Sequence, residues 1–309
     1  MQRNVSLDLE HARAVATGAA EAAGHLLRAQ AQRAFTVRSK GQHGDLVTDL
    51  DLASEKLIVS HLRNAFPEHR IITEEAGELA GNDSWTWLVD PLDGTNNLAI
   101  GLTAYGVGLA LCQQGLPRVA VIHDVPRAMT WSATRGHGAH GPAGRLHPCQ
   151  PQAPVGEQSL TIAWIQGHGV HRDDQTVQAL TCRLESESKR VLRLWAPLLC
   201  WIMLARGDID GIVLYRSGSI DLQAGTLIAQ EAGVRVHELD GTPFDDHFSS
   251  IDEQRSLVAG YPGVVELLLE LVQDIRPDVR PSRAPGGQGR GTPAHTSARV
   301  LPVGQGRPV

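Results

Sequence analysis

The chain has 309 residues, of which 28 are Lys or Arg and 34 are Asp or Glu, and its formal net charge at pH 7 is −6. Hydrophobic residues make up 42% of the chain, which excludes wholesale disorder and predicts one large domain or two closely associated ones. Because the chain is mildly acidic, we expect neither a nucleic-acid polymer nor a membrane among its partners.

The first 34 residues are predicted to be mainly helical, because apolar residues recur at helical spacing from Val15 to Leu26. Polar and charged residues interrupt this run, so it lacks the apolar segment of a signal peptide. No apolar run of 18 residues occurs elsewhere in the sequence. The four cysteines form no C-x-x-C pair, which argues against a disulfide framework or a zinc knuckle. We therefore expect a cytoplasmic protein with reduced thiols.

The N-terminal half, residues 1–145, is predicted to be an α+β domain that binds metal and phosphate. After the first helix, we expect a helix at residues 53–64 and strands at 70–73, 85–89, 105–111, 118–122 and 129–133. The first two of these strands run directly into acidic residues, Glu74 and Asp90. This arrangement indicates a site at the ends of the strands.

The second half, residues 146–275, is predicted to be an α/β domain on the substrate side. Its strands are expected at residues 159–165 and 209–214, and its helices at 195–205 and 222–231. The segment 276–309 has six Arg, six Pro, six Gly and one acid, so it carries about +5 and leaves −11 on the rest. Such a segment buries too little apolar surface to offset the conformational entropy lost on ordering, so we expect it to be disordered. A basic arm for an acidic partner is the alternative to a dispensable extension.

Asp90 and Asp93 flank a stiff turn that begins at Pro91. Two carboxylates that face one point repel each other, which is tolerable mainly when a cation lies between them, and oxygen ligands suit Mg²⁺ or Mn²⁺. Gly94 and Thr95 then open a short helical segment whose free N–H groups can hold a phosphate. An acidic surface turn is the alternative interpretation of this motif alone. A metal site and a phosphate cradle within six residues are typical of phosphoryl transfer.

Four separated motifs resemble those of the inositol monophosphatase-like family, the magnesium-dependent, lithium-sensitive phosphatases, over roughly residues 7–275. The motifs are Asp45-Leu-Val-Thr48-x-x-Asp51 with Lys40 upstream, Glu74-Glu75 after a strand, Trp87-Leu-Val-Asp90-Pro-Leu-Asp93-Gly-Thr95-Asn-Asn, and the segment Asp221–Gly233. The resemblance implies a layered α-β-α-β-α sandwich of the inositol monophosphatase and fructose-1,6-bisphosphatase type, usually a homodimer.

The resemblance also implies a role for each matching residue. Two or three Mg²⁺ ions, with Mn²⁺ as an alternative and Li⁺ as an inhibitor, would be held by Glu74, Asp90, the carbonyl of Leu92, Asp93 and Asp221. Asp51 and Thr95 would orient and deprotonate the attacking water, with Glu74 as a second contact to it. Backbone N–H groups of Gly94 and Thr95 would hold the phosphate. These roles agree with the way in which paired metal ions activate water and neutralise a reacting phosphoryl group.

The substrate half departs from the family pattern. Ile220 stands where the family has a Trp, which is either a tolerated packing change or a sign of a reshaped pocket. Segments that hold inositol hydroxyls in the family are replaced by Arg193-Leu-Trp195-Ala-Pro197 and Leu214-Tyr215-Arg216. Losing a hydroxyl acceptor weakens polyol binding, so simple inositol phosphate is not the favoured substrate. The bulky Trp195 and the cationic Arg216 would suit a larger, nucleoside-like or doubly anionic substrate. Arg193, Trp195 and Arg216 are the candidate contacts.

Two of these candidates have plainer interpretations. Arg216 could be an ordinary surface residue, and Trp195 is expected to lie in the core with Trp164 and Trp201. A polar loop at residues 167–174, with His168, His171, Asp173 and Asp174, is more readily explained by solvation than by metal binding.

The predicted function is therefore a Mg²⁺-dependent phosphatase that hydrolyses a small sugar, polyol, amino-alcohol or nucleoside phosphate by metal-activated water. Relatives that act on histidinol phosphate, fructose bisphosphate or a 3′-phosphonucleotide share these motifs and stay as alternatives. The non-enzymatic alternative is an inactive family member that binds a metal or a partner. The presence of every acidic residue that the chemistry needs argues against it.

Overall fold

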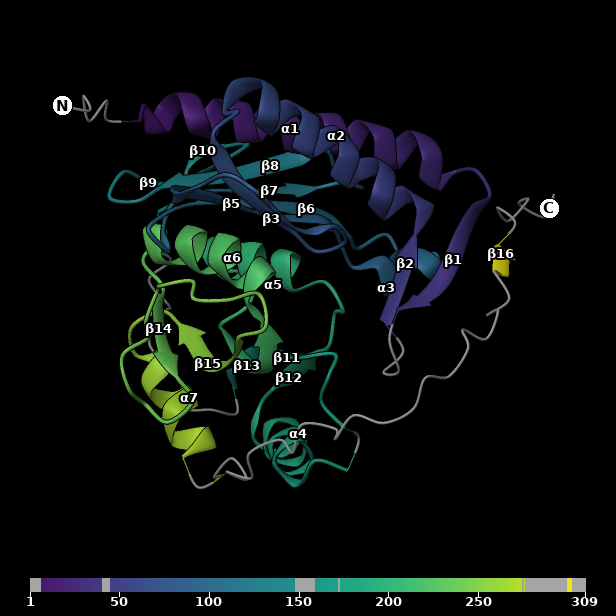
Figure 1. Ribbon diagram of the computed structural model, residues 1–309. Helices are drawn as coiled ribbons and strands as arrows, with labels where there is room; N and C mark the ends of the chain where they lie inside the picture. The colour runs from purple at the N-terminus through teal and green to yellow at the C-terminus, as the bar shows by residue number, and fades with distance from the viewer. Residues whose placement is uncertain are drawn as a thin grey trace, which may run out of the picture.

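The computed structural model describes residues 7–40, 45–147, 159–171, 173–273, 275 and 299–301. Its helices are α1 (Leu9–Ala31), α2 (Asp49–Ala65), α3 (Thr95–Ala99), α4 (Gln175–Glu187), α5 (Pro197–Arg206), α6 (Ser219–Glu231) and α7 (Val264–Val272). Figure 1 shows that α1 and α2 cover one face of a large sheet and that α5 and α6 lie between this sheet and a second one, with α4 and α7 beyond it. The layers therefore follow the predicted order α-β-α-β-α.

The large sheet has the strand order β10-β9-β8-β7-β6-β5-β3-β4. Its strands are β3 (His69–Thr73), β4 (Gly77–Leu79), β5 (Asn82–Asp93), β6 (Gly106–Gln113), β7 (Leu116–Asp124), β8 (Met129–Thr134), β9 (Gly138–Gly141) and β10 (Gly144–Arg145). β5 runs parallel to β3 and antiparallel to β6. Because β3 and β5 are parallel neighbours, the residues that follow Thr73 come out beside those that follow Val89.

The second sheet has the order β12-β11-β13-β15-β14, and a small third sheet has the order β16-β1-β2. The strands are β11 (Thr161–Gln166), β12 (Arg190–Leu192), β13 (Gly211–Gly218), β14 (Arg235–Glu238) and β15 (Gln254–Gly260), with β1 (Phe35–Lys40), β2 (Asp45–Thr48) and β16 (Arg299–Leu301). β13 leads directly into α6, so the end of this sheet fixes where the first turn of α6 lies.

The end of β5 contains an irregularity that determines which way its acidic residues point. Asp90 pairs with Gly108 on β6 and Asp93 pairs with Gly106, so three steps on β5 match two steps on β6. In a regular strand, residues three apart point to opposite faces of the sheet. The extra residue is a β-bulge, and it allows Asp90 and Asp93 to face the same side.

Helices α5 and α6 pack on each other as well as on the sheets. Trp201 of α5 is fully buried and its indole ring lies over Gly225 of α6. A Cβ atom at position 225 would lie only 2.1 Å from Cδ1 of this ring, so glycine is what allows the two helices to approach this closely. On the opposite side of the large sheet, α1 buries a stripe of alanines for a similar close contact.

Several predicted boundaries differ from the observed ones. The second helix begins at Asp49 rather than at residue 53, because Thr48 and Asp51 form a capping box. The helix predicted from residue 222 begins at Ser219, which places Asp221 in its first turn. Helices α4 and α7 were not predicted from the sequence.

The expected domain boundary adjoins residues 148–158, which lie outside the described residues. The expected disordered tail also lies outside the described residues, except for residues 299–301, which pair with β1.

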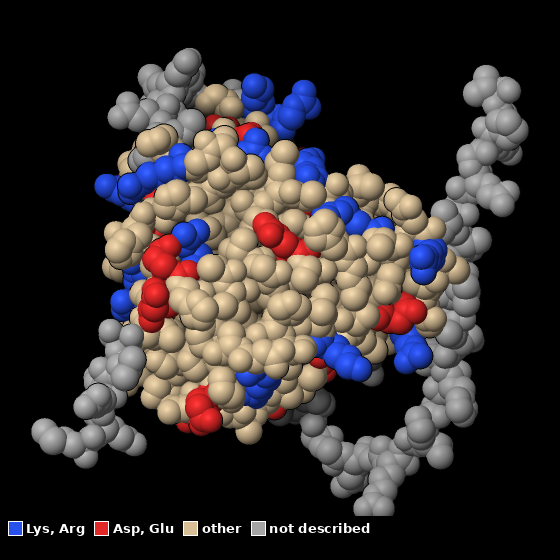
Figure 2. Space-filling model, turned by 90° about the horizontal axis from the view of Figure 1, so that it is seen from above, with Lys and Arg blue, Asp and Glu red and all other residues tan. Residues whose placement is uncertain are grey.

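Neither the surface in Figure 2 nor the described helices have features typical of membrane or polyanion binding. On the face in Figure 2, basic and acidic side chains are interspersed among uncharged ones, without a continuous stripe of either sign. Within the described part of the chain, no helix is both long enough and apolar enough to cross a bilayer.

Replacing Gly225 by Ala is expected to destabilise the protein by about 1–3 kcal/mol, because the added methyl group collides with the buried Trp201 ring. Gly18→Ala is the matched control, since Gly18 is an exposed residue of α1 and no atom beyond the adjacent backbone of its own helix lies within 4 Å of its Cβ position. The control should be neutral or more stable by up to about 1 kcal/mol. Urea unfolding of both variants measures the difference, and equal stabilities would contradict this account of the α5–α6 contact.

Candidate active site

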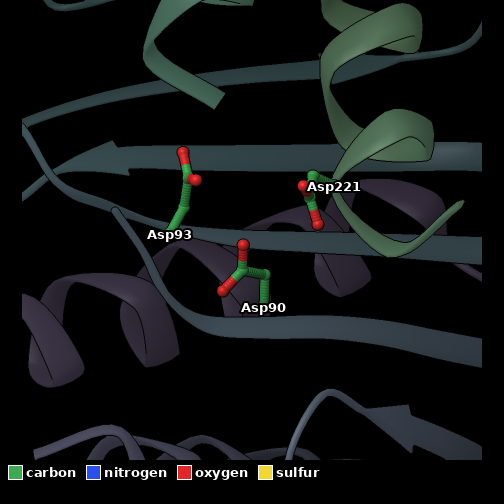
Figure 3. Close-up of side chains that lie close together, drawn as sticks. All are labelled: Asp90, Asp93 and Asp221. Carbon is green, nitrogen blue, oxygen red and sulfur yellow. The ribbon is translucent and has the colours of Figure 1, made fainter. Parts of the chain in front are cut away.

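Three carboxylates converge at the junction of the large sheet and α6. Asp90 and Asp93 come from the bulged end of β5 and Asp221 comes from the first turn of α6, and each offers an oxygen within 4.8 Å of the other two (Figure 3). Asp90 and Asp93 are buried, and Asp221 is half-buried. Such a cluster of oxygen ligands suits a hard divalent cation.

Burial and mutual repulsion act together on these groups. Burial raises the pKa of Asp90 well above its ordinary value, and the nearby charges of Glu74 and Asp221 raise it further. The pKa of Asp93 is raised in the same way, first by burial and then by Asp221. Among the described residues, no Lys or Arg forms an ion pair with Asp90 or Asp93. A cation bound between the carboxylates would relieve this repulsion.

Glu74 follows β3 and lines the same cavity, as the parallel pairing of β3 with β5 requires. Burial raises the pKa of Glu74 to about 8, with Asp221 and Glu75 adding to the rise and Lys40 opposing it. The ammonium group of Lys40 lies 3.2 Å from Oε1 of Glu74 and 2.8 Å from Oε1 of Glu75. Lys40 therefore holds the Glu74 side chain at the edge of the cluster.

Asp51 and Thr95 form a hydrogen-bonded pair beneath the carboxylates. Oγ1 of Thr95 donates to Oδ1 of Asp51 at 2.8 Å and lies 2.9 Å from the carbonyl oxygen of Leu92. The other Asp51 oxygen accepts the N–H of Thr48, at 2.8 Å, and its hydroxyl. Burial raises the pKa of Asp51 to about 6 against the effect of these hydrogen bonds. A buried carboxylate that titrates near neutrality is suited to accept a proton.

The turn between β5 and α3 needs a glycine. Gly94 has φ +89°, and a Cβ atom there would lie 2.8 Å from the carbonyl oxygen of Ala104. This left-handed residue turns the chain into α3, so that Gly94 and Thr95 line the cavity beside the carboxylates.

Sequence reasoning missed several residues that hold the site in place. The hydroxyl of Ser54 donates to the carbonyl oxygen of Pro91 at 2.7 Å, and the N–H of Leu198 donates to Oδ2 of Asp93 at 2.8 Å. Glu55 accepts the backbone N–H groups of residues 75 and 76, which fixes the loop after Glu74. Ser54 and Glu55 lie on the buried face of α2, so polar residues on an otherwise apolar helix face were the available signal.

All of the predicted metal, water-activating and phosphate residues except Asp51 line one cavity of about 260 Å³, which we call the acidic cavity. Asp51 lies behind Thr95, out of contact with the cavity but bonded to a residue that lines it. The remaining walls come from the end of β11, from the junction of β13 with α6 and from the segment before α5, and they include Gln166, Ser219, Ile220 and Trp195.

The three predicted substrate contacts have different positions. Trp195 lines the acidic cavity and is 60% exposed, so the expectation that it lies in the core with Trp164 and Trp201 is wrong. Arg193 lines a neighbouring cavity. Arg216 lines neither, because its backbone has φ +48° and its guanidinium lies over the ring of Tyr215, 3.6 Å from Asp174. We therefore leave Arg216 out of the proposed binding residues.

Comparisons with known proteins match most of this chain. A family model described as the inositol monophosphatase family matches residues 8–276. The chain belongs to this family. Inositol monophosphatase 1 of Solanum lycopersicum is 32% identical to this family member over 284 residues, covering 88% of the chain and 98% of the relative. Nus factor SuhB of Escherichia coli is also 32% identical, over 84% of the chain and 95% of the relative.

Solved structures of relatives have the same fold as this family member. Inositol monophosphatase from Anabaena superposes with a TM-score of 0.74 at 26% identity, covering 88% of this chain and 98% of the other. The extragenic suppressor protein suhB of Bartonella henselae superposes with a TM-score of 0.75 at 27% identity, covering 85% and 99%. The family resemblance and the layered fold expected from the sequence are thus confirmed.

The raised pKa values predict a pH-dependent response to Mg²⁺. Because folding raises the pKa of Glu74 to about 8 and of Asp51 to about 6, the metal-free folded protein takes up protons that the unfolded chain does not. Its stability should therefore rise as the pH falls from 8.5 to 6. Saturating Mg²⁺ is expected to raise the melting temperature by roughly 5 °C or more at pH 8.5 and by less at pH 6.

Calorimetry at the two pH values measures this response. Asp93→Asn should raise the melting temperature of the metal-free protein at pH 8.5, because it removes a repelling charge, and should reduce the shift caused by Mg²⁺. Asp83→Asn is the control, since Asp83 is 85% exposed and far along β5 from the cluster. A shift caused by Mg²⁺ that is the same at both pH values would contradict the assignment of these carboxylates.

Proposed function

We propose that this chain is a Mg²⁺-dependent phosphatase that hydrolyses small phosphomonoesters by direct attack of water. The observation that carries the proposal is the convergence of Asp90, Asp93 and Asp221 beside the turn formed by Gly94 and Thr95. Buried carboxylates such as those of Asp90 and Asp93, which form no ion pair with a Lys or Arg of the described residues, call for cations, and the adjacent turn offers backbone N–H groups to an anion.

The donor set fits Mg²⁺, because all of its candidate ligands are oxygens: the carboxylates of Glu74, Asp90, Asp93 and Asp221 and the carbonyl of Leu92. We propose two or three ions, with Mn²⁺ as a substitute and Li⁺ as an inhibitor. When bound, Mg²⁺ lowers the pKa of water and stabilises the charge of the reacting phosphoryl group.

The residues of the chain would position the substrate and move the proton. The N–H groups of Gly94 and Thr95 hold the phosphate oxygens against the carboxylate cluster. Oγ1 of Thr95 accepts a proton from the attacking water while its own proton passes to Oδ1 of Asp51, 2.8 Å away. Glu74 makes the second contact to that water and fixes its direction of attack.

The named relatives leave room for other roles, since both inositol monophosphatases and proteins named Nus factor SuhB match over most of the chain. Sugar, polyol, amino-alcohol and nucleoside phosphates are the substrate classes to be tested, with histidinol phosphate, fructose bisphosphate and 3′-phosphonucleotides among them. The alternative is a member that acts by binding a partner rather than by catalysis. A homodimer and a cytoplasmic location remain proposals from the family and the sequence.

Phosphate release with Mg²⁺ from a panel of these monoesters tests the proposal. Asp51→Asn is expected to lower kcat by about 10²- to 10⁴-fold, because the carboxamide cannot accept the proton passed on by Thr95. The shift in melting temperature caused by Mg²⁺ should survive in this variant, because Asp51 lies behind the cluster and does not line the cavity.

Asp49→Asn is the matched control on the same helical turn, since Asp49 is exposed and, among the described residues, accepts the N–H of Thr36. Its kcat should stay within about twofold of the wild type. No phosphate release from any ester, or turnover that a chelator leaves unchanged, would overturn the proposed function.

A further inference from the structure

A larger cavity of about 710 Å³ adjoins the acidic cavity, and we call it the adjoining cavity. The two cavities share Asn96, Gln166, Gly167, His168, Trp195 and Pro197 in their walls. A phosphate held beside Asp90 and Asp93 would therefore have the adjoining cavity as neighbouring space for the group that it esterifies. Its volume is that of a site for a drug-sized ligand rather than for a small fragment.

The walls of the adjoining cavity expose large apolar side chains. Trp195 is 60% exposed and Ile100, just after α3, is 68% exposed. Together with Ile251 of the acidic cavity, they account for half of the six strongly exposed large hydrophobic residues in the described part of the chain. Exposed apolar residues gathered around a cavity mark a binding surface more often than residues scattered singly do.

Trp195 differs from the other tryptophan in these walls. Trp164 is buried, and its indole N–H donates to Oγ1 of Thr181, so it supports the wall from behind. Trp195 precedes α5 and leaves most of its surface open. Such an indole is a stacking platform for a flat ring.

The charges of the two cavities are opposite. Every acidic residue in these walls lies in the acidic cavity, whereas the adjoining cavity has none in its described lining. Besides His168 and His171, its basic lining residue is Arg193. Arg193 is exposed, its Nη2 lies 3.3 Å from Oε1 of Gln166, and it forms no ion pair within the described residues. A polyol would find no carboxylate to accept its hydroxyl protons here, whereas an anionic group would find a guanidinium.

We propose that the adjoining cavity is the leaving-group site and that it takes a nucleoside, with its base stacked on Trp195 and a second phosphate held by Arg193. This inference rests on the proposed function, because the phosphate that is cleaved must lie in the acidic cavity. It names the substrate class as a nucleotide that carries two separate phosphates, and it assigns the second anion to Arg193 rather than to Arg216.

The test compares esters that differ by one feature at a time. Phosphate release by the full chain with Mg²⁺ is measured for adenosine 2′-, 3′- and 5′-monophosphate, adenosine 3′,5′-bisphosphate, myo-inositol 1-phosphate and glycerol 2-phosphate. The best adenosine ester is expected to exceed inositol phosphate in kcat/KM by at least tenfold. The bisphosphate should exceed the best monophosphate by roughly fivefold or more.

Variants then separate the base from the second phosphate. Trp195→Ala should lower kcat/KM for the adenosine esters, relative to glycerol 2-phosphate, by roughly 5- to 100-fold, mainly through KM, whereas Trp195→Phe should recover most of the loss. Arg193→Gln should remove the preference for the bisphosphate over the monophosphate. Met129→Ala and Arg235→Gln are the controls, since both residues are exposed and line neither cavity.

A binding measurement gives a readout that does not need turnover. Adenosine 3′,5′-bisphosphate is expected to quench the tryptophan fluorescence of the wild type in a saturable way, and the Trp195→Phe variant should lose most of this response. Hydrolysis of inositol phosphate in preference to every adenosine ester, or an equal effect of Trp195→Ala on all substrates, would overturn this inference while leaving the proposed function intact. Absence of hydrolysis of every ester would overturn both.

Discussion

The carboxylates of Asp90, Asp93 and Asp221 lie within 4.8 Å of one another, and two of the three are buried. Like charges at this separation oppose folding, so the surrounding structure must hold them in place. The β-bulge turns Asp90 and Asp93 to one side of the sheet, and the N–H of Leu198 fixes an oxygen of Asp93. The contact of Trp201 with Gly225 sets α6, and with it Asp221, against α5. Much of the layered fold thus serves to keep a repulsive cluster together.

The order and identity of the acidic residues were predictable from the sequence, because the motifs are local. Glu74 and Asp90 directly follow the apolar segments that predict strands at residues 70–73 and 85–89. Pro91 and Gly94 are typical of turns. Parallel pairing of the two strands then brings the acids together. The beginning of α2 was misplaced because the predicted boundary relied on apolar spacing and did not use the capping box between Thr48 and Asp51.

The substrate side could not be predicted in the same way, because exposure and direction depend on tertiary packing. Trp195 is a large apolar residue of the kind usually found in a core, yet it precedes α5 in the walls of two cavities and is exposed. Arg216 was placed near the substrate by its position in the sequence. Its left-handed backbone and its contacts with Tyr215 and Asp174 direct the Arg216 side chain away from both cavities. The hydrogen bonds from Ser54 and Leu198 join residues 37 and 105 positions apart, and no local pattern reports such pairs.

One short segment of the chain serves both cavities. Trp195 stands in the wall of each, and three residues later the backbone of Leu198 holds Asp93. A substitution that moves the backbone of this segment, as distinct from one that only shortens the Trp195 side chain, would therefore shift a carboxylate of the cluster as well. As substrate preference evolves on this scaffold, we therefore expect changes that move the backbone at residues 195–197 to arise together with compensating changes in cation affinity. Substrate preference and cation affinity are coupled through this segment.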